Sequence, residues 1–127
     1  MEYKSFTSLE VYQECRKFRK MISATVKQFF PQSEKFLLTA QILDASRSIT
    51  ANLAEGHGRF YYQDSIKFCR NSRGSLEESL EHLITAFDEG YIISENLKAH
   101  KMQYDTCLRL INGYIRYLGN SKRGEKD

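Results

Sequence analysis

The chain has 127 residues, enough to bury one hydrophobic core but not two. Hydrophobic residues make up 41% of it and charged residues 28%, and its seven glycines and one proline are too few for an all-β fold. The longest apolar runs span a few residues, far short of the roughly 20 needed to cross a bilayer, and the N-terminal segment is polar and acidic. We therefore expect a cytoplasmic protein with no membrane association.

The net charge of +3 conceals an uneven distribution along the chain. Residues 57–73 contain four Lys or Arg and one acid, whereas residues 74–95 contain six acids and no Lys or Arg. Residues 98–127 are basic again. A chain segregated in this way can present a basic surface despite its small total charge.

The first predicted helix covers about residues 9–30, where apolar side chains recur every three or four positions. Thr7 and Glu10 match a capping box, which satisfies amides that are otherwise unpaired at a helix start. Pro31 ends the helix because it lacks an amide hydrogen and disfavours helical geometry at the preceding residue. The expected apolar stripe comprises Val11, Cys15, Phe18, Ile22, Val26 and Phe29.

The second and third predicted helices cover about residues 33–55 and 61–89. Ser33 is the expected N-cap of the second helix, and Gly56 is the expected glycine just past its end. Gly90 is expected to end the third helix in the same way.

The fourth predicted helix covers about residues 94–118, with Ser94 as its N-cap. The connections between the four helices are short, which places neighbouring helices antiparallel. The sequence therefore predicts an all-α fold, an antiparallel up-and-down four-helix bundle over residues 1–119, followed by a polar, basic and disordered tail over residues 120–127.

Neither a catalytic nor a metal site is evident from the sequence. None of the three histidines follows a carboxylate by three residues, so the Glu-x-x-His pairs that bind metals in helical bundles are missing. No cysteine pair has the spacing of zinc ligands, and no base stands beside a nucleophile in a local motif. Cys15, Cys69 and Cys107 fall on apolar stripes, which is typical of buried thiols in a reducing compartment. We expect no enzyme, cofactor or metal.

The most specific local feature is the turn with the sequence ANLAEGHGR after the second helix. A carboxylate is unfavourable near a helix C-terminus, so Glu55 needs a partner, and Arg59 is the nearest candidate. We predict a structural turn in which Gly56 ends the helix, Gly58 allows the chain to reverse, and Glu55 and Arg59 form a clamp, with Asn52 close to the apolar stripe. The alternative is that Arg59 faces a ligand or nucleic acid.

A row of cations on the third helix suggests a binding surface. Lys67, Arg70 and Arg73 lie on successive turns of this helix and could bind a phosphate backbone. Phe60, Tyr61 and Tyr62 precede them and could stack on bases. The alternative is an ordinary solvated helix face. The predicted nucleic-acid contacts are Arg59, Lys67, Arg70 and Arg73, with Arg16, Lys17 and Lys20 of the first helix.

Gly74 and Ser75 interrupt the third helix. A glycine within a helix costs on the order of 1 kcal/mol relative to alanine, which is tolerated where another backbone approaches closely. By helical phase Gly74 points away from the core, so Gly74 and Ser75 are the predicted contact between copies of the chain.

Several blocks of sequence resemble the bacterial 23S rRNA intervening-sequence proteins, also called four-helix bundle or S23 ribosomal proteins. Residues 36–42 (FLLTAQI), 45–49 (ASRSI) and 51–59 (ANLAEGHGR) carry the resemblance, together with residues 74–78 (GSLEE). Residues 86–92 match the family's exit from the third helix, so the resemblance covers nearly the whole chain. The chain departs from the family at residues 69–73 (CRNSR), where members often have an aliphatic or Ala-rich segment.

The resemblance implies a fold more than a role. Members are encoded inside insertions of 23S rRNA genes and as free-standing genes. Their fold is similar to that of accessory proteins of diversity-generating retroelements, which form pentameric barrels, bind nucleic acid and associate with a reverse transcriptase. The resemblance thus implies a homopentamer, with RNA or DNA as ligand and a reverse transcriptase as a further candidate partner.

Two functions remain open at this point. The first is a non-enzymatic homo-oligomer that binds nucleic acid, RNA in preference to DNA, through a basic surface. The second is a protein-interaction scaffold or accessory subunit, in which the basic half of the third helix meets the acidic half of a neighbouring subunit.

Overall fold

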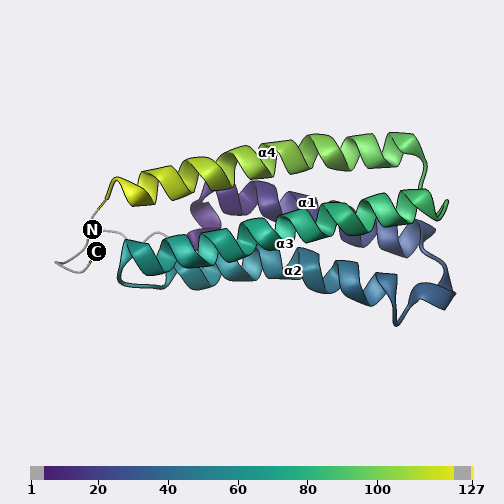
Figure 1. Ribbon diagram of the computed structural model, residues 1–127, viewed down its shortest axis with the longest axis horizontal. Helices are drawn as coiled ribbons and strands as arrows, with labels where there is room; N and C mark the ends of the chain where they lie inside the picture. Colours follow the sequence, from purple (N-terminus) through teal and green to yellow (C-terminus); the bar gives the residue numbers. More distant parts are fainter. Residues whose placement is uncertain (1–4, 122–126) are drawn as a thin grey trace.

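The computed structural model describes residues 5–121 and 127, and its described part contains four long helices and no strand (Figure 1). Each helix runs antiparallel to the next, as predicted for an up-and-down bundle. The predicted all-α four-helix bundle is thus confirmed. None of the described helices is both long and apolar enough to span a membrane. The elements are α1 (Glu10–Phe29), α2 (Leu38–His57), α3 (Tyr62–Asp88) and α4 (Ser94–Gly119), with 3-10 turns at Phe6–Ser8 and Gln32–Glu34.

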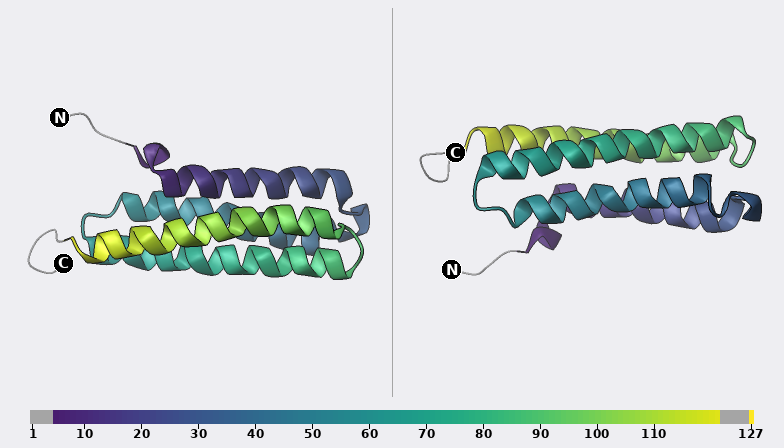
Figure 2. Two further views of the ribbon diagram at one scale, coloured as in Figure 1. Left: turned by 90° about the horizontal axis from the view of Figure 1, so that it is seen from above. Right: turned by 60° about the horizontal axis from the view of Figure 1, so that its bottom comes forward.

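The helices form a ring in chain order. α1 packs against α2 and α4, and α3 packs against α2 and α4, whereas α1 and α3 lie at opposite corners of the bundle (Figure 2). We call the end where α1 begins and α4 ends the terminal end, and the opposite end the distal end. The diagonal position of α1 and α3 decides which surface residues can act together.

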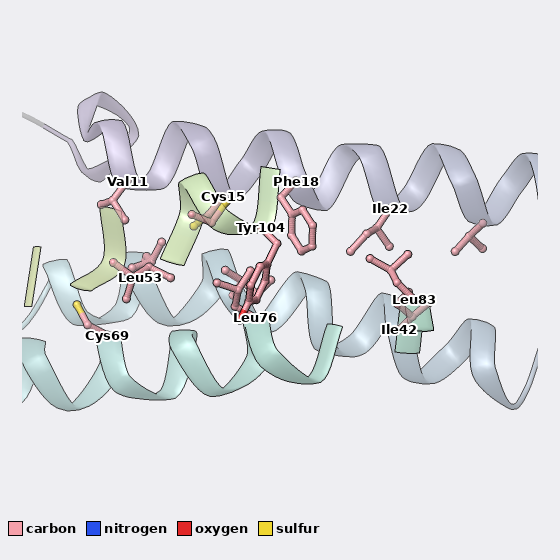
Figure 3. Close-up of a cluster of buried hydrophobic side chains, with 14 of the residues drawn as sticks. Val11, Cys15, Phe18, Ile22, Ile42, Leu53, Cys69, Leu76, Leu83 and Tyr104 are labelled. Atoms are coloured by element: carbon pink, nitrogen blue, oxygen red, sulfur yellow. The ribbon is translucent and has the colours of Figure 1, made fainter. Parts of the chain in front are cut away.

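The core follows the apolar stripes of the four helices (Figure 3). Phe18 and Ile22 of α1, Leu76 and Leu83 of α3 and Ile111 of α4 are fully buried and belong to one core that runs along the bundle. Burying a side chain of this size contributes about 1.5–3 kcal/mol to folding. The predicted stripe of the first helix is buried except for Phe29, which is 40% exposed at the last position of α1.

The start of α2 differs from the prediction. Ser33 lies in a 3-10 turn, and the helix begins at Leu38 instead of near residue 33. Glu34 replaces the predicted cap, because its Oε1 accepts the Leu38 amide hydrogen at 3.1 Å while its Oε2 accepts a hydrogen bond from the Tyr91 hydroxyl at 2.7 Å. Tyr91 lies in the connection between α3 and α4 at the distal end, so the sequence around Glu34 does not predict this contact.

Two further predicted caps are also wrong. Thr7 lies in a 3-10 turn before α1, the N-cap of α1 is Leu9, and no side chain caps it. Ser94 is the first residue of α4, and the preceding Ile93 amide instead donates to Asn96 Oδ1 at 3.0 Å. The helix end at Gly90 is confirmed: Gly90 has φ +80°, and the Tyr91 amide donates to Ala86 O at 2.9 Å in a Schellman motif.

The C-terminal residue contacts the start of α3. The carboxylate of Asp127 accepts the amide hydrogens of Tyr62 and Gln63, each at 2.8 Å. These amides have no partner within the helix, so a carboxylate here is favourable both as a cap and for the helix dipole. Of the tail predicted to be disordered, residues 122–126 lie outside the described residues.

Candidate nucleic-acid interface

The turn between α2 and α3 contains the ion pair expected from its sequence. An Arg59 guanidinium nitrogen lies 2.7 Å from Glu55 Oε1, and the guanidinium carbon lies 4.6 Å from the centroid of the Phe68 ring. Both charged side chains are about half exposed, so the pair itself adds little stability. Its effect is to orient Arg59 across the α2–α3 junction, whereas Asn52 forms a separate contact with Ser48 Oγ at 2.9 Å.

Gly56 has a different role from the predicted helix end. α2 continues to His57, and Gly58 is its C-cap with a right-handed φ of −78°, so Gly56 lies inside the helix and the predicted stop is wrong. A Cβ atom on Gly56 would lie 2.9 Å from Phe68 Cβ and 3.1 Å from Ser65 O. The Ser65 hydroxyl donates to Gly56 O at 2.7 Å across the same contact. Gly56 therefore allows α2 and α3 to approach closely where the chain reverses.

The predicted cations of α3 fall into two environments. Lys67 and Arg70 are exposed on the outer face of the helix. Arg73 is half-buried and turned toward α4, where its guanidinium donates to Asn112 Oδ1 at 2.7 Å. With Arg59 held by Glu55, this leaves Lys67 and Arg70 as the cations of the predicted row that point into solvent.

The predicted contact between copies is also divided. Gly74 is exposed, and no described atom outside its own helix lies within 4 Å of a Cβ built on it. Ser75 instead turns toward α2, where its hydroxyl donates to Ser48 Oγ at 2.9 Å. This bond lies within the chain, so Gly74 is the better placed of the two residues to meet another copy.

The cations of α1 gather on one exposed face. Arg16 and Lys20 are one turn apart with Lys17 between them, and none pairs with a described carboxylate. Two shallow hollows meet at Arg16, and the described residues that line them include no acid. One is lined by Gln13, Arg16, Lys17, Lys20 and Met21, and the other by Thr7, Tyr12, Gln13 and Arg16.

The structure does not bring the two predicted groups of cations together. α1 and α3 occupy opposite corners, so their outer faces point away from each other across the bundle (Figures 1 and 2). Within one copy, Lys67 and Arg70 therefore do not share a surface with the cations of α1. The predicted site is thus two surfaces, of which the α1 surface is the more uniformly basic.

Sequence reasoning missed a third basic feature, on α4. Arg109 and Arg116 line a groove between α1 and α4 at the terminal end, with Tyr114 and Leu110 in its wall and Glu10 of α1 as the one acid among the lining residues. The available signal was the basic composition after residue 98, but only the ring order of the helices shows that these arginines face α1.

Basic and acidic residues are distributed unequally between the two halves of the bundle. The terminal half of the bundle, residues 5–19, 48–74, 107–121 and 127, contains nine Lys or Arg and five acids. The distal half, residues 20–47 and 75–106, contains six Lys or Arg and nine acids. The segregation seen in the sequence thus becomes a basic and an acidic half of the bundle, which favours approach of an anionic partner to the terminal half.

The buried thiols have the properties of core side chains. The pKa of Cys15 is raised by a hydrogen bond with the Cys107 thiol and by burial, and burial raises the pKa of Cys69 to about 11. A protonated, inaccessible thiol is a poor nucleophile and a poor metal ligand. The three cysteines are free and buried, as predicted. Among the described residues no group of three or more His, Cys, Asp or Glu is placed to hold a metal ion.

Comparisons with known proteins agree with this architecture. The chain is similar to a protein of unknown function from the S23 ribosomal protein family of Bacteroides thetaiotaomicron, with a TM-score of 0.75 and 21% identity over 83% of this chain and 97% of that one. This likeness concerns the fold, and no curated protein matches the sequence. The family model of the 23S rRNA-intervening sequence proteins matches residues 7–113, and no enzyme family is indicated. The chain therefore belongs to the 23S rRNA-intervening sequence protein family.

Proposed function

We propose that this protein is a cytoplasmic, non-enzymatic homo-oligomer that binds nucleic acid, RNA in preference to DNA, through the exposed cations of α1. The observation that supports this most strongly is the face formed by Arg16, Lys17 and Lys20, which carries three cations around an acid-free hollow. Phosphate backbones bind such faces by releasing condensed counterions, without a need for a deep pocket. Tyr12 in the adjoining hollow offers a ring for base stacking.

The α3 cations form a second, smaller candidate surface. Lys67 and Arg70 are exposed, while Arg59 and Arg73 would have to leave Glu55 and Asn112 to contact a ligand. Family membership and the resemblance to pentameric accessory proteins support several copies, with five as the implied number. Several copies would multiply the α1 face, and a reverse transcriptase is the further partner that the resemblance suggests.

The test is binding of labelled single-stranded and duplex RNA, and of DNA of the same sequence, as a function of salt. Replacing Arg16, Lys17 and Lys20 together with Ser removes three phosphate contacts, so the slope of log K against log[salt] should become less negative by about 2 for a single strand. Between 50 and 200 mM salt the wild-type affinity attributable to these contacts should fall about 20-fold.

A matched control carries the same charge change outside the α1 face, with Lys35, Lys98 and Lys101 replaced by Ser. It should bind RNA as the wild type does, because these residues lie near the acidic end. Equal loss in both triple variants would show that net charge alone is responsible and that the α1 face is not the site. An unchanged affinity in the α1 variant would exclude the proposed surface.

The second candidate function is an interaction scaffold or accessory subunit without a direct nucleic-acid role. The segregated charges of α3 favour it, because a basic and an acidic segment of one helix can complement a protein surface. Light scattering with absorbance at 260 nm separates the two functions. Protein free of nucleic acid, with no RNA affinity at moderate salt but a salt-sensitive oligomer, would favour the scaffold.

A further inference from the structure

The groove between the start of α1 and the second half of α4 has the size and the walls of a small-ligand site. Its volume is about 380 Å³, within the range of about 300–1,000 Å³ that is typical of such sites. Leu9 and Val11 of α1 and Leu110 and Tyr114 of α4 form its apolar walls. The groove therefore suits a ligand that carries one compact apolar group.

Two arginines add positive charge to this apolar surface. Arg109 and Arg116 are exposed and lie seven residues apart, on the same face of α4. Neither forms an ion pair or a side-chain hydrogen bond with a described residue. Glu10, on α1, is the one acid among the lining residues. An anion is therefore favoured on the α4 side of the groove, next to the apolar walls.

A nucleotide within an RNA strand combines these properties. The phosphates on either side of it carry the charges that Arg109 and Arg116 would neutralise, and its base can stack on the ring of Tyr114. Glu10 lies on the α1 side, where a carboxylate can accept a hydrogen bond from the amino group of a base such as cytosine. Each charged residue of the groove thus has a counterpart on the nucleotide.

The groove also adjoins the basic face of α1. Gln13 and Lys17 line the hollow on that face, and they follow Glu10 by three and seven residues on the same side of the helix. A strand bound to the α1 cations would therefore pass within reach of the groove. A base of a single strand is free to turn into it, whereas the bases of a duplex are paired and stacked.

We propose that the groove between α1 and α4 binds one unpaired nucleotide of an RNA strand, with its flanking phosphates at Arg109 and Arg116 and its base against Tyr114. This inference rests on the proposed nucleic-acid function and adds a second site to it. The α1 cations bind the backbone of single strands and duplexes alike, and the groove makes the protein prefer single strands.

Gly113 allows the groove to be blocked without any change in charge. It lies in the lining, and a Cβ atom built on it has only the end of the Arg116 side chain within 4 Å, at 3.8 Å. Gly113→Phe should therefore keep the wild-type helical circular dichroism and weaken binding of labelled single-stranded oligocytidine about tenfold, the effect of losing one stacked base. The slope of log K against log[salt] should not change, because no cation is removed. Binding of duplex RNA should also stay the same.

Two controls and a charge variant complete the binding experiment. Gly119→Phe adds the same ring at the last residue of α4, where no described atom lies within 4 Å of a built Cβ, and it should bind both RNAs as the wild type does. Arg109→Ser with Arg116→Ser removes two phosphate contacts, so the slope for the single strand should become less negative by about 1.4. Lys98→Ser with Lys101→Ser, near the start of α4, should leave that slope unchanged.

A small probe tests the groove independently of the α1 face. Cytidine 3′,5′-bisphosphate carries one base and both flanking phosphates, so it should shift the Gly113 amide signal in nuclear magnetic resonance spectra. The shift should persist in the triple Ser variant of the α1 face, and inorganic phosphate should not reproduce it. If the α1 variant binds RNA as the wild type does, the proposed function fails while the groove can still be observed.

Four results would overturn the proposal. The first is an unchanged affinity of folded Gly113→Phe for the single strand, and the second is an equal loss for single strand and duplex. The third is polyglutamate that binds as tightly as oligocytidine and is weakened equally by Gly113→Phe, which would assign the groove to an acidic protein segment. The fourth is a smaller oligomer of Gly113→Phe by light scattering, which would make the groove a contact between copies.

Discussion

Replacing Gly56 with Ala should destabilise the fold, although alanine is the better helix former. α2 passes so close to α3 here that the new methyl would lie 2.9 Å from Phe68 Cβ and 3.1 Å from Ser65 O. Neither atom can rotate away, because the carbonyl belongs to the backbone of α3 and Cβ is fixed to it. The two helices must separate, and the 2.7 Å hydrogen bond from the Ser65 hydroxyl to Gly56 O must lengthen.

The expected magnitude combines three effects at this contact. Alanine stabilises a helix interior by about 1 kcal/mol relative to glycine. Overpacking a tight contact costs about 2 kcal/mol, and weakening a buried hydrogen bond costs about 1 kcal/mol. The free energy of unfolding should therefore fall by about 2 kcal/mol, which corresponds to a urea midpoint roughly 1 M lower for a protein of this size.

The assay is urea unfolding followed by circular dichroism at 222 nm, with two other glycines as controls. Gly74→Ala adds its methyl in open space within α3, so in dilute solution it should stabilise the protein by about 1 kcal/mol. Gly58→Ala should change the stability by less than about 0.5 kcal/mol, because its φ is −78° and the nearest atom is at 3.5 Å. A Gly56→Ala midpoint at or above that of the wild type would refute the close approach as the reason for this glycine.

Three other features of the interior give measurable outcomes. The buried Ser72 hydroxyl donates to Ile49 O at 2.7 Å, so Ser72→Ala should lower the unfolding free energy by about 1 kcal/mol in the same urea assay. Burial raises the pKa of Tyr104 and of Tyr114 to about 12, so stability held below pH 10 should be lost as the pH rises toward 12, with two late steps in the tyrosinate absorbance. The three native thiols should react with Ellman's reagent only after unfolding, and fast reaction of folded protein would contradict their burial.

The sequence was a good guide to the helices and a poor guide to their starts. Apolar spacing predicts helices because it reports burial, which most of the predicted positions share. Capping depends on single hydrogen bonds that can come from elsewhere in the chain. Glu34 caps α2 from within a 3-10 turn and is itself held by Tyr91, more than 50 residues away. No local pattern predicts that arrangement.

In the turn, the Glu55–Arg59 ion pair was predicted correctly and the role of Gly56 wrongly, because the first is a local contact and the second depends on another helix. Glu55 and Arg59 are four residues apart, so their ion pair is a local event that the sequence predicts. The role of Gly56 depends on Phe68 and Ser65, which arrive with α3. A glycine near a helix end fits both a stop and a close approach, and only the packing of the two helices distinguishes them.

Helical phase predicts which cations of α1 and α3 are exposed, but it does not predict whether they share one surface of the bundle. Phase gives the outward side of each helix, and Arg16 and Lys67 are indeed both exposed. It does not give the order of helices around the bundle, which places α1 and α3 at opposite corners. The two groups of cations therefore form separate surfaces on one copy. Substitution of Arg16, Lys17 and Lys20 should weaken RNA binding even though Lys67 and Arg70 are unchanged, and the reverse substitutions on α3 should leave binding by the α1 face intact.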